Sequence, residues 1–122
     1  MKINEKGTNM DITPEIKDYL YKKLAYIEKF LNPNDDSVLC EVELGKTTNH
    51  HKGGDIFMTE INLHMAGKNL RNVSEVEDLF SSIDIAKDEI IRIIQLNKDK
   101  RISLVRRGGA KIKNIVRGIF SK

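Results

Sequence analysis

The apolar residues of this chain recur at two spacings, one typical of helices and one typical of strands. Spacings of three and four residues predict a first helix that begins at Pro14 and ends near Asn32-Pro33. Thr13 suits the N-cap of this helix, and Pro14 suits its first position, where no backbone N–H is needed. The predicted apolar stripe consists of Ile16, Leu20, Leu24, Ile27 and Leu31.

A second helix is predicted to start after Ser74, because Ser74 and Glu77 have the spacing of a capping box. It should run to about Arg101. The sequence Arg106-Arg107-Gly108-Gly109 is expected to break the pattern, and the apolar residues that follow suggest a short amphipathic helix that folds on a partner. The stripe of the second helix consists of Leu79, Ile83, Ala86, Ile90, Ile94 and Asn97.

Alternating apolar and polar residues predict four strands. The first covers residues 2–8, and a short fourth covers residues 69–74 after a turn at Gly67-Lys68-Asn69. Between the two middle strands, residues 45–55 form a polar stretch that is too long for a tight hairpin. The inward positions of the middle strands are Val38, Cys40, Val42 and Leu44, followed by Phe57, Thr59, Ile61, Leu63 and Met65.

This element order, β-α-β-β-β-α, predicts an α+β fold. Two helices with one apolar stripe each would cover one face of a four-stranded sheet. The length of 122 residues suits a single domain, which we expect over residues 1–103, with a basic C-terminal tail over residues 104–122.

Charge is distributed unevenly along the chain. Residues 1–89 carry 11 Lys/Arg and 17 Asp/Glu, a net charge of −6, whereas residues 90–122 carry 10 Lys/Arg and the single acid Asp99, a net charge of +9. This asymmetry favours a polyanionic partner, either nucleic acid or a membrane surface, although a solvated tail would look the same. No apolar run approaches the roughly 20 residues of a membrane span, and the lone Cys40 fits a reducing, cytoplasmic setting.

Residues for catalysis are hard to find. The chain has no Gly-rich phosphate loop, no H-E-x-x-H sequence and no nucleophile elbow. His50 and His51 fall in the predicted loop, His64 falls on the polar face of a strand, and Cys40 faces inward. We therefore expect no enzymatic activity, no metal site, no cofactor and no small-molecule substrate.

Basic residues give the stronger signal. Tyr19, Lys22, Lys23 and Tyr26 share one flank of the first helix, where rings could stack on bases while ammonium groups meet phosphates. Alternatively, the tyrosines cap the edge of the core and the lysines extend to solvent. The helix macrodipole explains one or two cations at the end of the second helix but not the basic run that continues beyond it. The candidate RNA-binding residues are Lys22, Lys23, Lys29, Arg92, Lys98, Lys100, Arg101, Arg106 and Arg107.

Short segments between Met1 and about Arg101 carry a family pattern. They include Lys23-Leu24-Ala25, Ile27-Glu28-Lys29, Val42-Glu43, Gly67 with Leu70, Glu77-Asp78-Leu79-Phe80-Ser81-Ser82-Ile83-Asp84 and Lys98-Asp99-Lys100. On these residues the chain resembles the ribosome hibernation promoting factors, also called ribosome-associated inhibitor A or light-repressed-type proteins, in their short form.

The resemblance implies a protein that binds 16S rRNA in the mRNA–tRNA channel of the small ribosomal subunit and blocks translation in stress or stationary phase. It carries family basic positions over to Lys23, Arg92, Lys98 and Lys100. Where relatives often have a basic residue, this chain has Tyr26, Glu89 and Leu96. We expect a monomer whose partner is the small ribosomal subunit. A general double-stranded-RNA-binding module and a protein-interaction domain are the alternatives.

Overall fold

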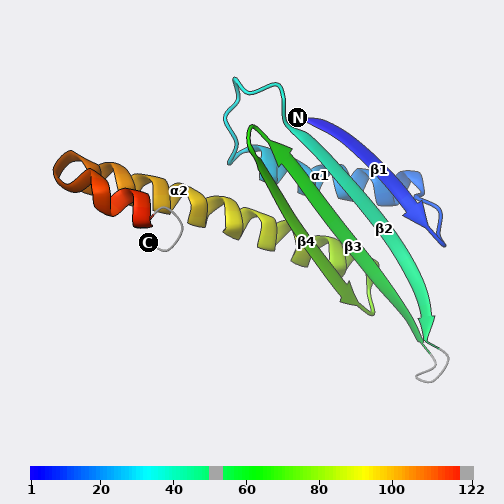
Figure 1. Cartoon of the computed structure of the whole chain (residues 1–122). Coiled ribbons are helices and arrows are strands. Elements are labelled where there is room, and N and C mark those ends of the chain that lie inside the picture. The colour runs from blue at the N-terminus through cyan, green and yellow to red at the C-terminus, as the bar shows by residue number, and fades with distance from the viewer. Residues whose placement is uncertain (50–53, 119–122) are drawn as a thin grey trace. The chain divides into compact units, whose positions relative to one another are not determined.

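Figure 1 shows a computed structural model of the chain, which describes the backbone of residues 1–49 and 54–118 and the side chains of residues 1–47 and 54–98. The predicted β-α-β-β-β-α order is confirmed. The elements are β1 (Lys2–Thr8), α1 (Pro14–Glu28), β2 (Leu39–Asn49), β3 (Gly54–Met65), β4 (Lys68–Val76) and α2 (Leu79–Gly118). The chain divides into two compact units, Met1–Ile91 and Arg92–Lys122.

The sheet has the linear order β1-β2-β3-β4. β1 and β2 are parallel because α1 carries the chain back between them, and the other two pairs are antiparallel. Apolar residues meet across the strands, with Ile3 opposite Cys40, Val42 opposite Ile61 and Leu63 opposite Leu70. The two-residue turn between β3 and β4 contains Gly67 with φ of 71°, a conformation that glycine adopts without steric cost.

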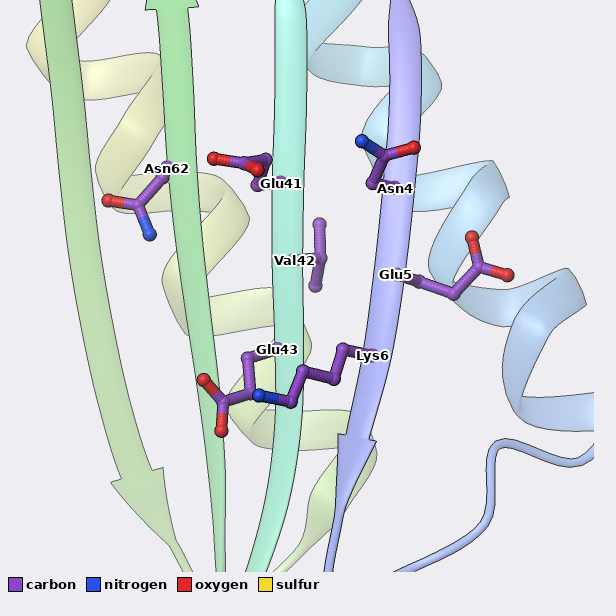
Figure 2. A pocket seen from close by; sticks show the side chains of 7 residues that line it. All are labelled: Asn4, Glu5, Lys6, Glu41, Val42, Glu43 and Asn62. Atoms are coloured by element: carbon purple, nitrogen blue, oxygen red, sulfur yellow. The ribbon is translucent and has the colours of Figure 1, made fainter.

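The core of the first unit lies between one face of this sheet and the two helices. Leu20, Leu24 and Ile27 of α1 are fully buried, as are Ile83 and Ile90 of α2. Seven of the nine inward strand positions predicted from alternation are buried, namely Val38, Cys40, Val42, Leu44, Thr59, Ile61 and Leu63, whereas Phe57 and Met65 are half-buried. In Figure 2 both helices lie behind the sheet, so its other face is open. Burial of each large apolar side chain contributes about 1.5–3 kcal/mol to folding.

The start of α1 is as predicted, but its end comes earlier. The Thr13 side chain accepts a hydrogen bond from the backbone N–H of Ile16 at 3.2 Å, and Pro14 occupies the first turn. The helix ends at Glu28 rather than near Asn32. Backbone bonds from Phe30 to Ile27 and from Leu31 to Glu28, each spanning three residues, tighten the chain after the last α-helical turn.

The predicted capping box at Ser74 and Glu77 is wrong. Ser74 belongs to β4, where its buried hydroxyl donates to the carbonyl oxygen of Ser82 at 2.6 Å. The second helix begins at Leu79, and the carboxylate of Asp78 accepts from the backbone N–H of Ser81 at 2.8 Å. Sequence spacing alone could not identify the cap, because both Ser74 with Glu77 and Asp78 with Ser81 are spaced for capping. The extent of β4, which includes Ser74, distinguishes between the two pairs.

Two other element boundaries differ from the predictions. The polar stretch 45–55 is mostly strand, because β2 and β3 stay paired up to Asn49 opposite Gly54. The predicted helix break at residues 106–109 is also wrong, because α2 extends to Gly118. Glycine costs a helix about 1 kcal/mol relative to alanine but presents no steric block to it. The predicted boundary between residues 103 and 104 stays a prediction.

Candidate nucleic-acid interface

The exposed flank of α1 brings lysines and a tyrosine together, as the helical spacing predicted. Tyr26 is 47% exposed. The ammonium nitrogens of Lys29 and Lys23 lie 4.8 and 5.8 Å from its centre. Lys22 and Lys29 line a shallow hollow beside Tyr26, with a volume of about 270 Å³. We call Lys22, Lys23, Tyr26, Lys29 and the Lys87 described next the α1 basic cluster.

Lys87 was missed by sequence reasoning. It lies on α2, and its Nζ is 5.2 Å from the centre of the Tyr26 ring. The Lys87 side chain is only 14% exposed and pairs with Asp88 on the same helix. The one signal in the sequence is its position directly after the buried Ala86, which places it at the border of the apolar stripe.

Tyr19 has a structural role that its neighbour Tyr26 lacks. Its ring packs edge-on against Phe80 of α2, with 4.7 Å between the ring centres, and its hydroxyl donates to the Asp84 carboxylate at 2.8 Å. Burial, followed by this hydrogen bond, raises the pKa of Tyr19. The interpretation of tyrosines as caps on the core edge therefore holds for Tyr19.

Lys23 joins the same contact between the helices. Its Nζ lies 3.3 Å from Asp84 Oδ1, and the side chain is 25% exposed. The hydrogen bond with Asp84 raises the pKa of Lys23, which keeps the ammonium charged at any physiological pH. An RNA-binding role for Lys23 stays a prediction.

The remaining predicted residues lie in the second unit. Arg92 and Lys98 are helical residues of α2, and both are exposed. Lys100, Arg101, Arg106 and Arg107 are also helical, but their side chains lie outside the described part of the chain. Their roles in RNA binding stay predictions.

The hollow on the open face of the sheet differs in charge from the α1 basic cluster. A hollow of about 240 Å³ is lined by Asn4, Glu5, Lys6, Glu41, Val42, Glu43 and Asn62. Figure 2 shows Asn4, Glu41 and Glu43 in front of the strands, while Glu5 points toward the side of α1. Glu5 accepts a hydrogen bond from the Tyr21 hydroxyl at 2.7 Å. Because carboxylates repel phosphate, the hollow beside Glu41 and Glu43 is a poorer site for nucleic acid than the α1 basic cluster.

The structure gives His64 hydrogen-bond partners and buries Cys40, the two potentially reactive side chains in the described part of the chain. His64 lies on the polar face of β3, as predicted, with Nε2 2.7 Å from Glu41 and Nδ1 2.7 Å from Asn69. Burial raises the pKa of the Cys40 thiol to about 12, so it is unreactive at neutral pH. His50 and His51 lie outside the described residues.

Among the side chains of residues 1–47 and 54–98, no group of three His, Cys, Asp or Glu could hold a metal ion. The helices in that part of the chain are also too polar or too short to cross a membrane.

The fold and the α1 basic cluster define a small α+β domain with a cationic, aromatic helical flank. Residues 3–102 match the family described as Sigma 54 modulation protein / S30EA ribosomal protein. The chain belongs to this family. The family is non-enzymatic, which confirms the expectation that the chain is not an enzyme.

Individual relatives agree with this assignment. The ribosome hibernation promotion factor of Bacillus subtilis is 28% identical over 100 residues, which cover 82% of this chain and 50% of the relative. The ribosome hibernation promoting factor of Klebsiella oxytoca is 29% identical over 101 residues, covering 82% of this chain and 96% of the relative. The chain thus spans about half the length of the first relative and nearly all of the second.

A solved structure supports the same fold. The N-terminal domain of Protein Y from Thermus thermophilus superimposes with a TM-score of 0.64 at 27% identity, covering 77% of this chain and 96% of that domain.

Proposed function

We propose that this chain is a ribosome-associated hibernation factor of the cytoplasm. It would bind 16S rRNA in the mRNA–tRNA channel of the small subunit and block translation in stress or stationary phase. The observation that carries the proposal is the family match over residues 3–102, whose curated relatives are named ribosome hibernation factors.

The distribution of charge supports contact with RNA. The first unit, residues 1–91, has a net charge of −6, and the second, residues 92–122, has a net charge of +9. Within the acidic first unit, the α1 basic cluster places four lysines around one exposed ring. Ammonium and guanidinium groups that neutralise phosphates release counterions, which supplies most of the affinity of such contacts.

The mechanism is competition by occupancy, with no chemical step. A protein seated in the channel excludes mRNA and the anticodon ends of tRNA. The family resemblance implies basic residues at the positions of Tyr26, Glu89 and Leu96, so the basic residues beyond Arg101 would supply part of the binding energy.

Co-sedimentation with separated small and large ribosomal subunits at two salt concentrations tests this function, with tRNA as competitor. We expect binding to the small subunit that falls by roughly one logarithmic unit per tenfold rise in salt for each phosphate contact, and that tRNA displaces. Equal binding to any duplex RNA would instead indicate a general double-stranded-RNA-binding module. Binding that is insensitive to salt would indicate a protein-interaction domain.

A matched pair of variants tests the predicted contacts in the middle of α2. Replacing Lys98, Lys100 and Arg101 with Gln should reduce the salt dependence by about three units and leave melting unchanged. The control replaces Lys2, Lys6 and Lys68 with Gln, which removes the same charge from exposed positions of the sheet. If both triple variants lose the same affinity, net charge alone acts and the assignment of these contacts is wrong.

A further inference from the structure

Tyr26 is an exposed aromatic side chain on α1. The hydroxyls of Tyr19 and Tyr21 donate to Asp84 and Glu5, and both rings are half-buried. Tyr26 is 47% exposed, and its hydroxyl has no hydrogen-bond partner among the described residues. The ammonium groups of Lys23, Lys29 and Lys87 lie within about 6 Å of the centre of its ring.

The lysines around this ring differ in how their charge is balanced. Lys23 pairs with Asp84, and Lys87 pairs with Asp88. Among the described residues, Lys22 and Lys29 have no acidic partner. The α1 basic cluster therefore keeps a net charge of about +2 at the rim of the hollow beside Tyr26, because four lysines face two aspartates.

The paired and the unpaired lysines lie in different places around the Tyr26 ring. The half-buried Lys23 and Lys87, which pair with Asp84 and Asp88, lie 5.8 and 5.2 Å from the centre of the Tyr26 ring. The unpaired Lys22 and Lys29 line the hollow that the ring borders. An apolar partner would have to desolvate these ammonium groups, at a cost that the small exposed ring could not offset.

We propose that the α1 basic cluster is a binding site for one unpaired nucleotide of RNA. The base stacks on the exposed face of Tyr26, and the flanking phosphates contact Lys22 and Lys29. This inference rests on the proposed function and deepens it, because it assigns to α1 an unpaired base rather than duplex backbone. Stacking suits any base, so the site selects unpaired nucleotides rather than a sequence.

The test uses the full chain with two probes, a short unstructured RNA carrying 2-aminopurine and the purified small ribosomal subunit. Tyr26→Phe keeps the ring and should retain both the affinity and the quenching of 2-aminopurine fluorescence. Tyr26→Leu keeps apolar volume without a ring. It should abolish the quenching and weaken binding to both probes by about 5- to 150-fold, the equivalent of ~1–3 kcal/mol for one stacked base.

The controls separate stacking from charge and from general damage. Val73→Ala truncates another exposed apolar side chain, on the open face of the sheet, and should change nothing. Lys29→Gln should lower the salt dependence of binding by about one unit and retain the quenching. Lys2→Gln should leave the salt dependence unchanged.

The outcomes distinguish this site from the proposed function. Unchanged affinity and quenching in Tyr26→Leu would overturn the nucleotide site even if the small subunit is bound. Quenching that depends on the ring, without binding to the small subunit, would support the site and overturn the ribosomal function. Displacement of RNA by an acidic peptide that binds Tyr26→Phe and Tyr26→Leu alike would make the cluster a protein-binding surface and overturn the proposal.

Discussion

The contribution of His64, on the open face of the sheet, to the stability of the fold depends on pH. Its two ring nitrogens face acceptor atoms, Glu41 on β2 and Asn69 on β4, each at 2.7 Å. Both nitrogens donate only when the ring is protonated. The hydrogen bond with Asn69, followed by the one with Glu41, raises the pKa of His64 above its ordinary value. The protonated ring therefore links three strands.

The first prediction at this scale concerns pH. Because the folded-state pKa is raised, protonated His64 contributes stability that is fully present below its unfolded pKa of about 6.5. That contribution is lost as the pH rises through the folded pKa. Denaturant unfolding should therefore give wild type an advantage over His64→Gln at about pH 5.5 that shrinks at about pH 8. An advantage that is constant or grows with pH would contradict the assignment.

Single residues on α1 also mark how far sequence reasoning reaches. Helical spacing placed Tyr19 and Tyr26 on one flank but could not distinguish their roles. The distinction depends on Phe80 and Asp84, which come from α2 and contact Tyr19. Lys87 was missed for the same reason, because no spacing within one helix predicts a neighbour on another.

At the scale of elements, the start of α2 is fixed by Asp78 rather than by Ser74. The Asp78 carboxylate accepts from both the hydroxyl and the backbone N–H of Ser81, and these bonds lower the pKa of Asp78. A carboxylate at a helix N-terminus also interacts favourably with the macrodipole. Ser82 meanwhile bonds to Thr59 of β3 at 2.6 Å, which ties the first turn of α2 to the sheet.

A pair of substitutions tests this cap. Asp78→Ala should lower the melting temperature by roughly 4–8 °C, the usual effect of losing a helix cap in a domain of this size. Asp78→Ser keeps an acceptor and should recover most of that loss. Glu77→Ala should have little effect, whereas a capping box at Ser74 and Glu77 would make it the more damaging change.

The elements themselves were largely predictable, because burial on one face imposes a period that the sequence records. Alternation from Val38 to Leu44 identified the buried face of β2, and the stripe from Leu20 to Ile27 identified that of α1. Boundaries were less predictable. Residues 45–49 are polar, yet they remain in β2 because backbone pairing with β3 needs no apolar side chain.

At the scale of the whole molecule, charge follows the division into units. The acidic unit, residues 1–91, contains the described sheet and all of the buried apolar residues described except Ile94, and the basic unit, residues 92–122, contains one acid and ten Lys/Arg. Net self-repulsion in the basic unit decreases when a polyanion neutralises it. This arrangement separates the residues that stabilise the first unit from most of those that we expect to contact RNA.

Truncation after Ser103 tests that separation. It removes residues 104–122, which contain six Lys/Arg and no Asp/Glu, and retains the whole core of the first unit. We expect cooperative unfolding to persist, affinity for the small subunit to fall, and its salt dependence to decrease by up to about six units. A full-length variant with Gln at these six positions should lose the same salt dependence if charge alone is responsible. A truncated chain that fails to fold would place the apolar residues of the tail in the core. Unchanged affinity would instead confine RNA binding to residues 1–103, and would make the α1 basic cluster and the basic residues around Lys98 its main contacts.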